Sequence, residues 1–177
     1  YDGFKAEKNT ADRRKRIFSS TKIPAKIGLF VGTSGRYANK FWSEDEIANF
    51  CAAAPPDIFL FGGPAESERL DRLTRRDGCR SRTCVAVQTL DDLASVVAGC
   101  GLLICGDTLV MHLGQALNVP MIVLFGPTAH TEITIRGRKI VSPYACGPCY
   151  LRACDIQPSC MSAISPGRVL RAMADII

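Results

Sequence analysis

The sequence predicts an α/β fold in which a parallel β-sheet is flanked by helices, as in Rossmann-like domains. Short apolar runs alternate with helix-forming segments at a spacing of roughly 20–25 residues, which is typical of βαβ units. The chain of 177 residues is 47% hydrophobic and 22% charged, so it has enough apolar material for one domain with a buried core. In such a fold the loops that follow the strands all lie at one edge of the sheet.

The first half of the chain contains three predicted strands, each followed by a predicted helix. Ser43 and Glu46 have the spacing of a capping box, which begins a helix, and two prolines after residue 54 end it. Thr89 or Asp91 is suited to cap a later helix. The elements are expected in the order strand 26–31, helix 43–53, strand 57–61, helix 66–76, strand 83–87 and helix 89–99.

The second half is organised around residues 105–128. Gly106 turns the chain after a short apolar run, and Asp107 or Thr108 caps the helix that follows. Asn118 and Pro120 end that helix before the next apolar run. The remaining elements are expected as strand 101–105, a helix from about 108 to 117, strand 121–125, strand 138–141 and helix 166–177.

The face of the helix after residue 108 also has a predicted role. Thr108, His112 and Gln115 fall together on one flank, so a hydroxyl and an imidazole lie at the start of a helix that follows a buried strand. Free N–H groups and the positive end of the helix dipole bind phosphates at such a position. The alternative is a well-capped helix with an incidental histidine. The core stripe is expected to be Leu109, Leu113, Ala116 and Leu117.

Three loops at the predicted edge have the chemistry of a diphosphate site flanked by a nucleoside. The first contains Thr33, Ser34 and Lys40, whose hydroxyls donate hydrogen bonds and whose ammonium attracts a phosphate. The second contains Gly63 and Glu66, a carboxylate suited to a ribose hydroxyl. The third is the helix start already described. Each loop alone is a weak signal, and the hypothesis rests on their convergence.

Two common nucleotide-binding motifs are absent. A nicotinamide-binding domain requires G-x-G-x-x-G after the first strand and an acidic residue at the end of the second. The glycines here are Gly28, Gly32 and Gly35, and the second strand ends in Phe61. A P-loop is excluded because Lys40 is followed by Phe41 rather than serine or threonine.

Nine cysteines are a high number for a chain of this length. Five are scattered and are interpreted as small buried apolar residues: Cys51, Cys79, Cys84, Cys100 and Cys105. The other four have the close spacing of a four-thiolate zinc or iron–sulfur site with a structural role: Cys146, Cys149, Cys154 and Cys160. Only one C-x-x-C pair is present, however, so reduced cysteines that pack a loop, or an opportunistic disulfide, are the alternative.

The positive charge is concentrated in residues 1–22, which hold seven basic and three acidic side chains and account for +4 of the net +5. We interpret residues 1–23 as a basic linker or helix and residues 24–177 as the nucleotide-binding domain. A basic arm can also contact an anionic membrane surface or a phosphorylated partner. The amino-terminal residues lack the apolar core of a signal peptide, and no apolar run is long enough for a membrane span.

The motif D-T-x-x-M-H-L-x-x-A-L-x-V-P over residues 107–120, followed by L-F-G-P-T over 124–128, resembles the carboxyl-terminal domain of glycosyltransferase family 9. That family contains the ADP-heptose:lipopolysaccharide heptosyltransferases. Further matches are K-x-W at residues 40–42, the turn at 62–64 with Glu66 after it, and the cysteine pattern before the last helix. The resemblance covers roughly residues 24–177, and its central motif is fairly specific. One departure is Leu109, where the family usually has glycine after Asp-Thr.

The resemblance implies the carboxyl-terminal half of a GT-B fold, which holds the nucleotide sugar donor while the other half holds the acceptor and the general base. The implied donor is ADP-heptose or a similar sugar, and the acceptor is a lipid-linked surface glycan at the cytoplasmic face of the membrane. No metal is implied for the transfer, and this chain alone is expected to be inactive. The residues implied to bind phosphate and sugar are Thr33, Ser34, Lys40, Asp107, Thr108, Leu109 and His112, with Gly63 and Glu66 for the nucleoside.

Two rival functions are a nucleotide-binding regulatory module without transfer chemistry and a metal-containing interaction module whose basic arm binds nucleic acid. The second rival is disfavoured because the basic charge is confined to residues 1–22 and no aromatic stacking platform follows them. We therefore do not expect a nucleic acid partner.

Overall fold

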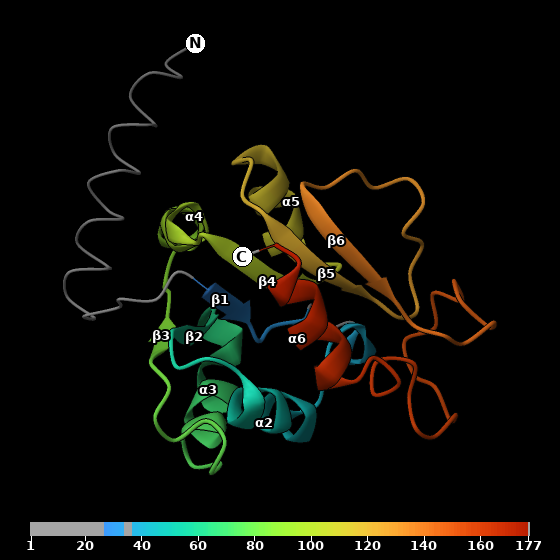
Figure 1. Ribbon diagram of the computed structural model, residues 1–177, viewed down its shortest axis with the longest axis horizontal. Coiled ribbons are helices and arrows are strands. Elements are labelled where there is room, and N and C mark those ends of the chain that lie inside the picture. Colours follow the sequence, from blue (N-terminus) through green and yellow to red (C-terminus); the bar gives the residue numbers. More distant parts are fainter. Residues whose placement is uncertain (1–26, 34–36, 177) are drawn as a thin grey trace.

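The computed structural model describes residues 27–33 and 37–176, which contain one parallel sheet of 6 strands. The strand order is β3-β2-β1-β4-β5-β6, so the order reverses between β1 and β4 (Figure 1). In open α/β sheets of this kind, ligands bind outside the carboxyl ends of the strands at that reversal. The strands are β1 (Ile27–Phe30), β2 (Ile58–Gly62), β3 (Cys84–Ala86), β4 (Leu102–Gly106), β5 (Met121–Phe125) and β6 (Gly137–Val141).

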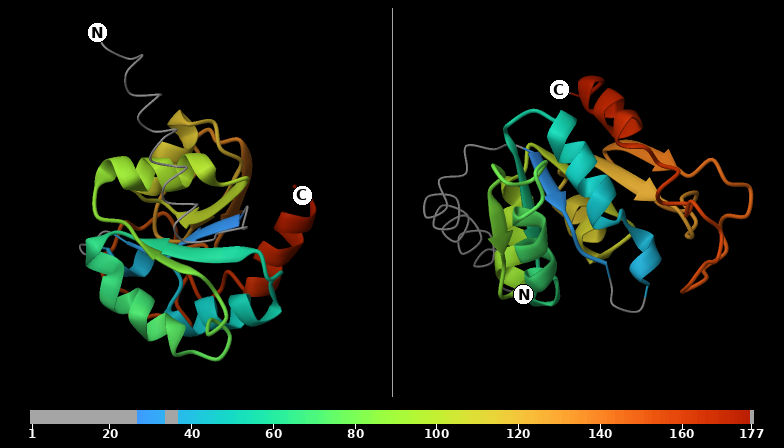
Figure 2. Two further views of the ribbon diagram at one scale, coloured as in Figure 1. Left: turned by 90° about the vertical axis from the view of Figure 1, so that its left-hand side faces the viewer. Right: turned by 90° about the horizontal axis from the view of Figure 1, so that it is seen from below.

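Helices cover both faces of the sheet, as Figure 2 shows from two sides. One face carries α2 (Glu44–Ala53), α3 (Ser67–Thr74) and α6 (Pro166–Ala174). The other carries α4 (Leu90–Gly99) and α5 (Leu109–Ala116). Two short 3-10 helices, η1 (Ala38–Lys40) and η2 (Pro64–Glu66), follow β1 and β2. Each strand and helix expected from the sequence is present, and the Rossmann-like fold is confirmed.

The predicted helix starts have the expected caps. Ser43 Oγ accepts a hydrogen bond from the Glu46 N–H at 3.4 Å, and the Ser43 N–H donates to Glu46 Oε2 at 2.7 Å. This is the reciprocal capping box that the spacing predicts. Thr89, rather than Asp91, caps α4 by accepting a hydrogen bond from the Asp92 N–H at 3.1 Å.

Two hydrophobic cores lie on opposite faces of the sheet. Strands β1, β2, β4 and β5 are buried along their whole length, as expected for strands covered on both sides. Trp42 and Phe50 pack with α2, α3 and α6 on one face, where Trp42 is only 1% exposed. Val97 and Met111 pack with α4 and α5 on the other face. The scattered cysteines are buried apart from Cys84, which is half-buried and whose pKa burial raises to about 11.

The predicted core stripe of α5 is wrong except at Leu113, which is half-buried and packs against the core. Leu109 is 56% exposed and Leu117 is 39% exposed, while Ala116 is also exposed. The buried face instead consists of Val110, Met111 and Gly114. It differs because the helix approaches the sheet most closely at a residue without a side chain: a Cβ on Gly114 would lie 2.5 Å from Met121 Sδ and 2.8 Å from Leu103 Cδ2.

This close approach gives a stability prediction for Gly114→Ala. Alanine is the better helix former by about 1 kcal/mol, but overpacking a core costs about 1–3 kcal/mol. Gly167→Ala in α6 is the matched control, because the nearest atom to its added Cβ lies 3.7 Å away. We expect Gly114→Ala to be less stable than Gly167→Ala by about 1–3 kcal/mol in urea unfolding. Equal free energies of unfolding for the two variants would contradict this packing.

The proposed boundary between the linker 1–23 and the domain 24–177 lies outside the described residues. In the part of the chain that the structure describes, no helix combines the length and the apolar character required to cross a membrane.

Candidate functional site

The loops after β1 and β4 meet at the carboxyl edge of the sheet. A Cβ on Gly106 would lie 2.5 Å from the Lys40 carbonyl oxygen, so glycine allows the turn before α5 to contact η1 directly. This contact brings the first and third loops of the predicted site together. They converge at the position where the strand order reverses.

Lys40 and Asp107 form an ion pair across these two loops. Lys40 Nζ lies 3.3 Å from Asp107 Oδ2, and each side chain is 17% exposed. A pair that is largely removed from water is screened less than one at the surface, so its charges act strongly on a neighbouring ligand. The carboxylate holds the ammonium beside the start of α5. The pairing itself was not predicted from the sequence.

The amino-terminal end of α5 is open. Thr108 is the N-cap residue, as one of the two predicted alternatives had it, but its side chain makes no capping hydrogen bond. Its hydroxyl instead lies 3.5 Å from the Gly106 carbonyl oxygen. Leu109 and His112 in the first turn are exposed. This turn therefore has no side-chain cap. The Met111 and His112 N–H groups donate to the Thr108 carbonyl, at 3.0 Å and 3.5 Å, so the N–H groups that precede them are the ones that can donate to an anion.

Glu66 lies beside the ends of β1 and β2. Its Oε2 accepts a hydrogen bond from the Gly63 N–H at 2.9 Å, which fixes the turn that contains both residues. A Cβ on Gly32 would lie 2.8 Å from the carboxyl carbon of Glu66, so the second loop also touches the first. Thr33 is half-buried in that first loop, whereas Ser34 lies outside the described residues.

Sequence reasoning missed an aromatic and cationic group next to Lys40. The Tyr37 ring centroid lies 4.8 Å from Lys40 Nζ and 5.9 Å from the Arg152 guanidinium carbon. Asn39 Nδ2 donates to the Leu151 carbonyl at 2.8 Å. The spacing of Tyr37 and Lys40 was a local signal that could have been read. The contact with Arg152 had no such signal, because the segments are more than a hundred residues apart.

Two buried polar atoms near this edge have no partner among the described residues. They are Asn39 Oδ1 and the hydroxyl of Thr128, which follows β5 and is 6% exposed. Buried polar atoms are normally hydrogen-bonded, so such atoms mark places where a ligand or an ordered water completes the bonding. Thr128 belongs to the L-F-G-P-T motif but was not among the predicted site residues.

The Cys-rich segment, residues 144–160, folds back onto the loop after β5. The N–H groups of Cys149 and Tyr150 both donate to the Pro127 carbonyl, at 3.0 Å and 2.9 Å. Burial, and after it the proximity of Cys149, Cys154 and Cys146, raises the pKa of Cys160. In residues 27–33 and 37–176, however, no three His, Cys, Asp or Glu side chains are arranged to hold a metal ion. The predicted zinc or iron–sulfur site at Cys146, Cys149, Cys154 and Cys160 is therefore not supported.

Two cavities lie on the side of α2 and α3. One has a volume of about 570 Å³ and is lined by Thr33 and Arg69 among others. Arg69 donates to the Val31 carbonyl at 2.7 Å and to the Trp42 carbonyl, and burial lowers its pKa. Through these two hydrogen bonds Arg69 stabilises the first loop. That loop connects this cavity to the site.

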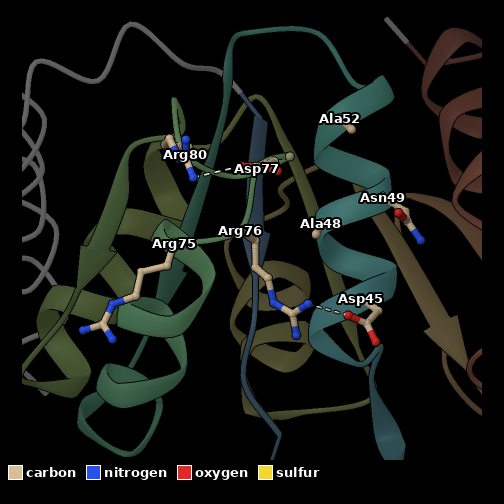
Figure 3. A pocket seen from close by; sticks show the side chains of 9 residues that line it. Asp45, Ala48, Asn49, Ala52, Arg75, Arg76, Asp77 and Arg80 are labelled. Atoms are coloured by element: carbon tan, nitrogen blue, oxygen red, sulfur yellow. Dashed lines mark hydrogen bonds and ion pairs between the residues drawn. The ribbon is translucent and has the colours of Figure 1, made fainter.

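The other cavity, of about 640 Å³, lies between α2 and the loop after α3 (Figure 3). Arg76 Nη1 lies 2.7 Å from Asp45 Oδ1, and Arg80 Nη2 lies 2.9 Å from Asp77 Oδ1. Because these charges neutralise one another in pairs, we do not assign a ligand to this cavity.

Comparisons with known proteins identify the family of the chain. The model of glycosyltransferase family 9 (heptosyltransferase) matches residues 4–159. The chain is 35% identical to lipopolysaccharide heptosyltransferase 1 of Pseudomonas aeruginosa over 102 residues, which are 56% of this chain and 28% of that protein.

Two solved structures have a similar fold. The glycosyl transferase family 9 structure from Veillonella parvula matches with a TM-score of 0.73 and 19% identity, over 96% of this chain and 51% of that chain. The structure of the E. coli heptosyltransferase WaaC with ADP-2-deoxy-2-fluoro heptose matches with a TM-score of 0.64 and 21% identity, over 85% of this chain and 43% of that chain. At these identities the likeness establishes the fold. The chain spans about half of the length of these proteins or less.

Proposed function

Because the chain belongs to glycosyltransferase family 9, we propose that it is the carboxyl-terminal, donor-binding half of a glycosyltransferase. The donor is a nucleotide diphosphate sugar, either ADP-heptose or one with a similar sugar. The observation that carries the proposal is the Lys40–Asp107 ion pair beside the uncapped start of α5. A partly buried cation beside a helix start without a side-chain cap forms a site for a diphosphate.

The site acts by stabilising the leaving group. An acceptor hydroxyl attacks the anomeric carbon, the bond from that carbon to the phosphate oxygen breaks, and the bonding electron pair stays on the diphosphate. Negative charge therefore grows on the phosphates during the transfer. Lys40 and the amino-terminal dipole of α5 lie where they oppose this charge, in surroundings that are already partly free of water.

The neighbouring residues have secondary roles in the proposal. Thr33, Thr108 and His112 donate hydrogen bonds to phosphate oxygens, and Ser34 extends the same loop. Gly63 and Glu66 hold the nucleoside, with the second carboxylate oxygen of Glu66 directed to a ribose hydroxyl. Leu109 adds bulk where the family usually has glycine, so donors other than ADP-heptose belong in any test. Leu109 is 56% exposed, and in this proposal it contacts the sugar.

The rest of the reaction depends on a second domain. The relatives are about twice as long as the matched region or longer, and we place the acceptor site and the general base in the part that this chain does not span. The acceptor is a lipid-linked glycan such as lipopolysaccharide, which puts the transfer at the cytoplasmic face of the inner membrane. The E. coli heptosyltransferase WaaC in complex with ADP-2-deoxy-2-fluoro heptose favours an adenine nucleotide as the carrier.

Ligand binding by the 177-residue chain tests the proposal. In calorimetric titration and thermal unfolding, ADP should bind while adenosine, which lacks the phosphates, should not. A ligand at 100 times its dissociation constant stabilises the folded state by about 2.7 kcal/mol, which raises the melting temperature by about 5–10 °C in a domain of this size. UDP, GDP and CMP serve as comparisons for the base. If none of the nucleotides binds, the chain is not a donor-binding domain.

A further inference from the structure

The Cys-rich segment is anchored against the first loop of the site. Asn39 Nδ2 donates to the Leu151 carbonyl at 2.8 Å, which ties the segment to η1. On the opposite side, the N–H groups of Cys149 and Tyr150 share the Pro127 carbonyl. Tyr150 has a φ of 55°, a conformation that is uncommon for residues other than glycine. These contacts fix the position of the segment. They therefore also fix the backbone position of the residue that follows Leu151.

That residue is Arg152, and its guanidinium lies beside the same aromatic ring as Lys40. The distances to the Tyr37 ring centroid are 4.8 Å from Lys40 Nζ and 5.9 Å from the Arg152 guanidinium carbon. A ring face attracts cations, so one tyrosine can gather two of them from distant parts of the chain. Because the two positive groups repel each other, an arrangement of this kind is most stable when an anion lies near both.

Positive charges outnumber negative charges around Tyr37. Lys40 is paired with Asp107 at 3.3 Å. Arg152 is exposed and takes part in no ion pair among the described residues. Of the three charged groups gathered here, two are cations and one is a carboxylate. The group therefore carries one net positive charge at the edge of the sheet where the start of α5 also opens.

We propose that Arg152 is a second phosphate-binding cation of the donor site, presented by the Cys-rich segment and complementary to Lys40. The proposal rests on the donor-binding function proposed above. A guanidinium presents paired N–H donors that match two phosphate oxygens, whereas an ammonium acts as a point charge. Lys40 and Arg152 together oppose the two phosphates of the donor. As the bond to the sugar breaks, the terminal phosphate becomes more negative and its attraction to both cations grows.

The proposal also gives the Cys-rich segment a role that needs no metal. The hydrogen bonds to Asn39 and Pro127 position Arg152, and the Tyr37 ring limits where its guanidinium can lie. The segment then forms a further wall of the donor site, in addition to the loops after β1, β2 and β4.

The test compares ADP and AMP binding in the Arg152→Ala variant of the 177-residue chain. We expect ADP to bind about tenfold more weakly than to the unaltered chain, because a charge-assisted contact to phosphate is lost. AMP, which lacks the second phosphate, should change by less than about threefold. Arg152→Lys should recover only part of the loss, because it restores the charge but not the paired donors.

Two further variants separate phosphate binding from a structural role. Arg75→Ala removes another exposed arginine at the end of α3, outside the site, and should leave ADP affinity unchanged. Tyr37→Ala should weaken ADP binding as Arg152→Ala does, while Tyr37→Phe keeps the ring and should not.

The possible outcomes distinguish the role of Arg152 from the donor-binding function. If the unaltered chain binds ADP and Arg152→Ala binds it equally well, the role of Arg152 is refuted and the donor-binding function stands. An equal loss of ADP and AMP affinity, together with a lower melting temperature, assigns Arg152 to structure alone and also refutes its role. Absence of ADP binding by the unaltered chain overturns both proposals.

Discussion

Lys40→Ala should weaken ADP binding by about 10- to 100-fold, the effect of losing a hydrogen bond to a charged group. Two changes combine in this variant. The cation that faces the diphosphate is removed, and the Asp107 carboxylate, which is 17% exposed, is left without its partner 3.3 Å away. An unpaired carboxylate next to the phosphates adds repulsion. Isothermal titration calorimetry at fixed ionic strength measures the change.

A double-mutant cycle separates the two effects. Asp107→Asn alone should change ADP affinity less than Lys40→Ala does, because it keeps the cation and removes a neighbouring negative charge, although Lys40 loses the partner that orients it. The double variant of Lys40→Ala and Asp107→Asn should recover part of the affinity that Lys40→Ala loses. Lys139→Ala is the control, because Lys139 lies on β6, donates to the His130 carbonyl and is distant in the sequence from the loops of the site. If Lys40→Ala binds ADP as tightly as the unaltered chain, the Lys40–Asp107 pair no longer supports the proposed function.

The same variants test whether Asp107 contacts the donor sugar. If the carboxylate only orients Lys40, Asp107→Asn affects ADP and ADP-sugar equally. A selective loss for the sugar nucleotide would show that Asp107 also accepts a hydrogen bond from a sugar hydroxyl.

Trp42→Ala should lower the free energy of unfolding by about 3–5 kcal/mol, the range for truncating a large aromatic side chain in a core. Trp42 is 1% exposed and packs against Phe50, with 5.5 Å between the ring centroids. Its Nε1–H donates to the Ile164 carbonyl at 2.7 Å in a buried position. Truncation therefore opens a cavity and leaves a buried carbonyl without its donor.

The Trp42→Phe variant separates the cost of the cavity from the cost of the lost hydrogen bond. Most of the aromatic volume remains, but the Ile164 carbonyl loses its donor, so we expect a loss of about 1–3 kcal/mol. Leu90→Ala is the control: that leucine is 57% exposed, and its truncation should change stability by less than about 0.5 kcal/mol. Urea unfolding monitored by circular dichroism gives all three values. A Trp42→Ala variant as stable as Leu90→Ala would contradict the packing described here.

The elements of the fold were predictable because their signals are local. The strands are short apolar runs, and the starts of α2 and α4 carry side chains that bond to their own backbone. The face of α5 was not predictable in the same way. Apolar residues occur around most of that helix, so the large leucines suggested a core face. The sheet instead approaches at Gly114, and the position of a close contact depends on how the helix crosses the strands.

The candidate site was predictable in its place but not in its contacts. The convergence of the loops follows from the parallel topology, which the spacing of elements indicates. The Lys40–Asp107 pair depends on how η1 folds over Gly106, which is set by loop conformation. The approach of Arg152 to Tyr37 depends on the path of a long irregular segment, for which the sequence contains no periodic signal.

Trp42 gives the molecule an optical property that follows from its position. The chain contains a single tryptophan, and it lies two residues after Lys40 in the segment braced by Arg69. Its indole is removed from water, so its emission should lie toward the blue end of the range for proteins and move to the red on unfolding. Tryptophan emission therefore arises from one known location beside the loop that contains Lys40. Ligand occupancy and folding can both be followed there without an attached dye.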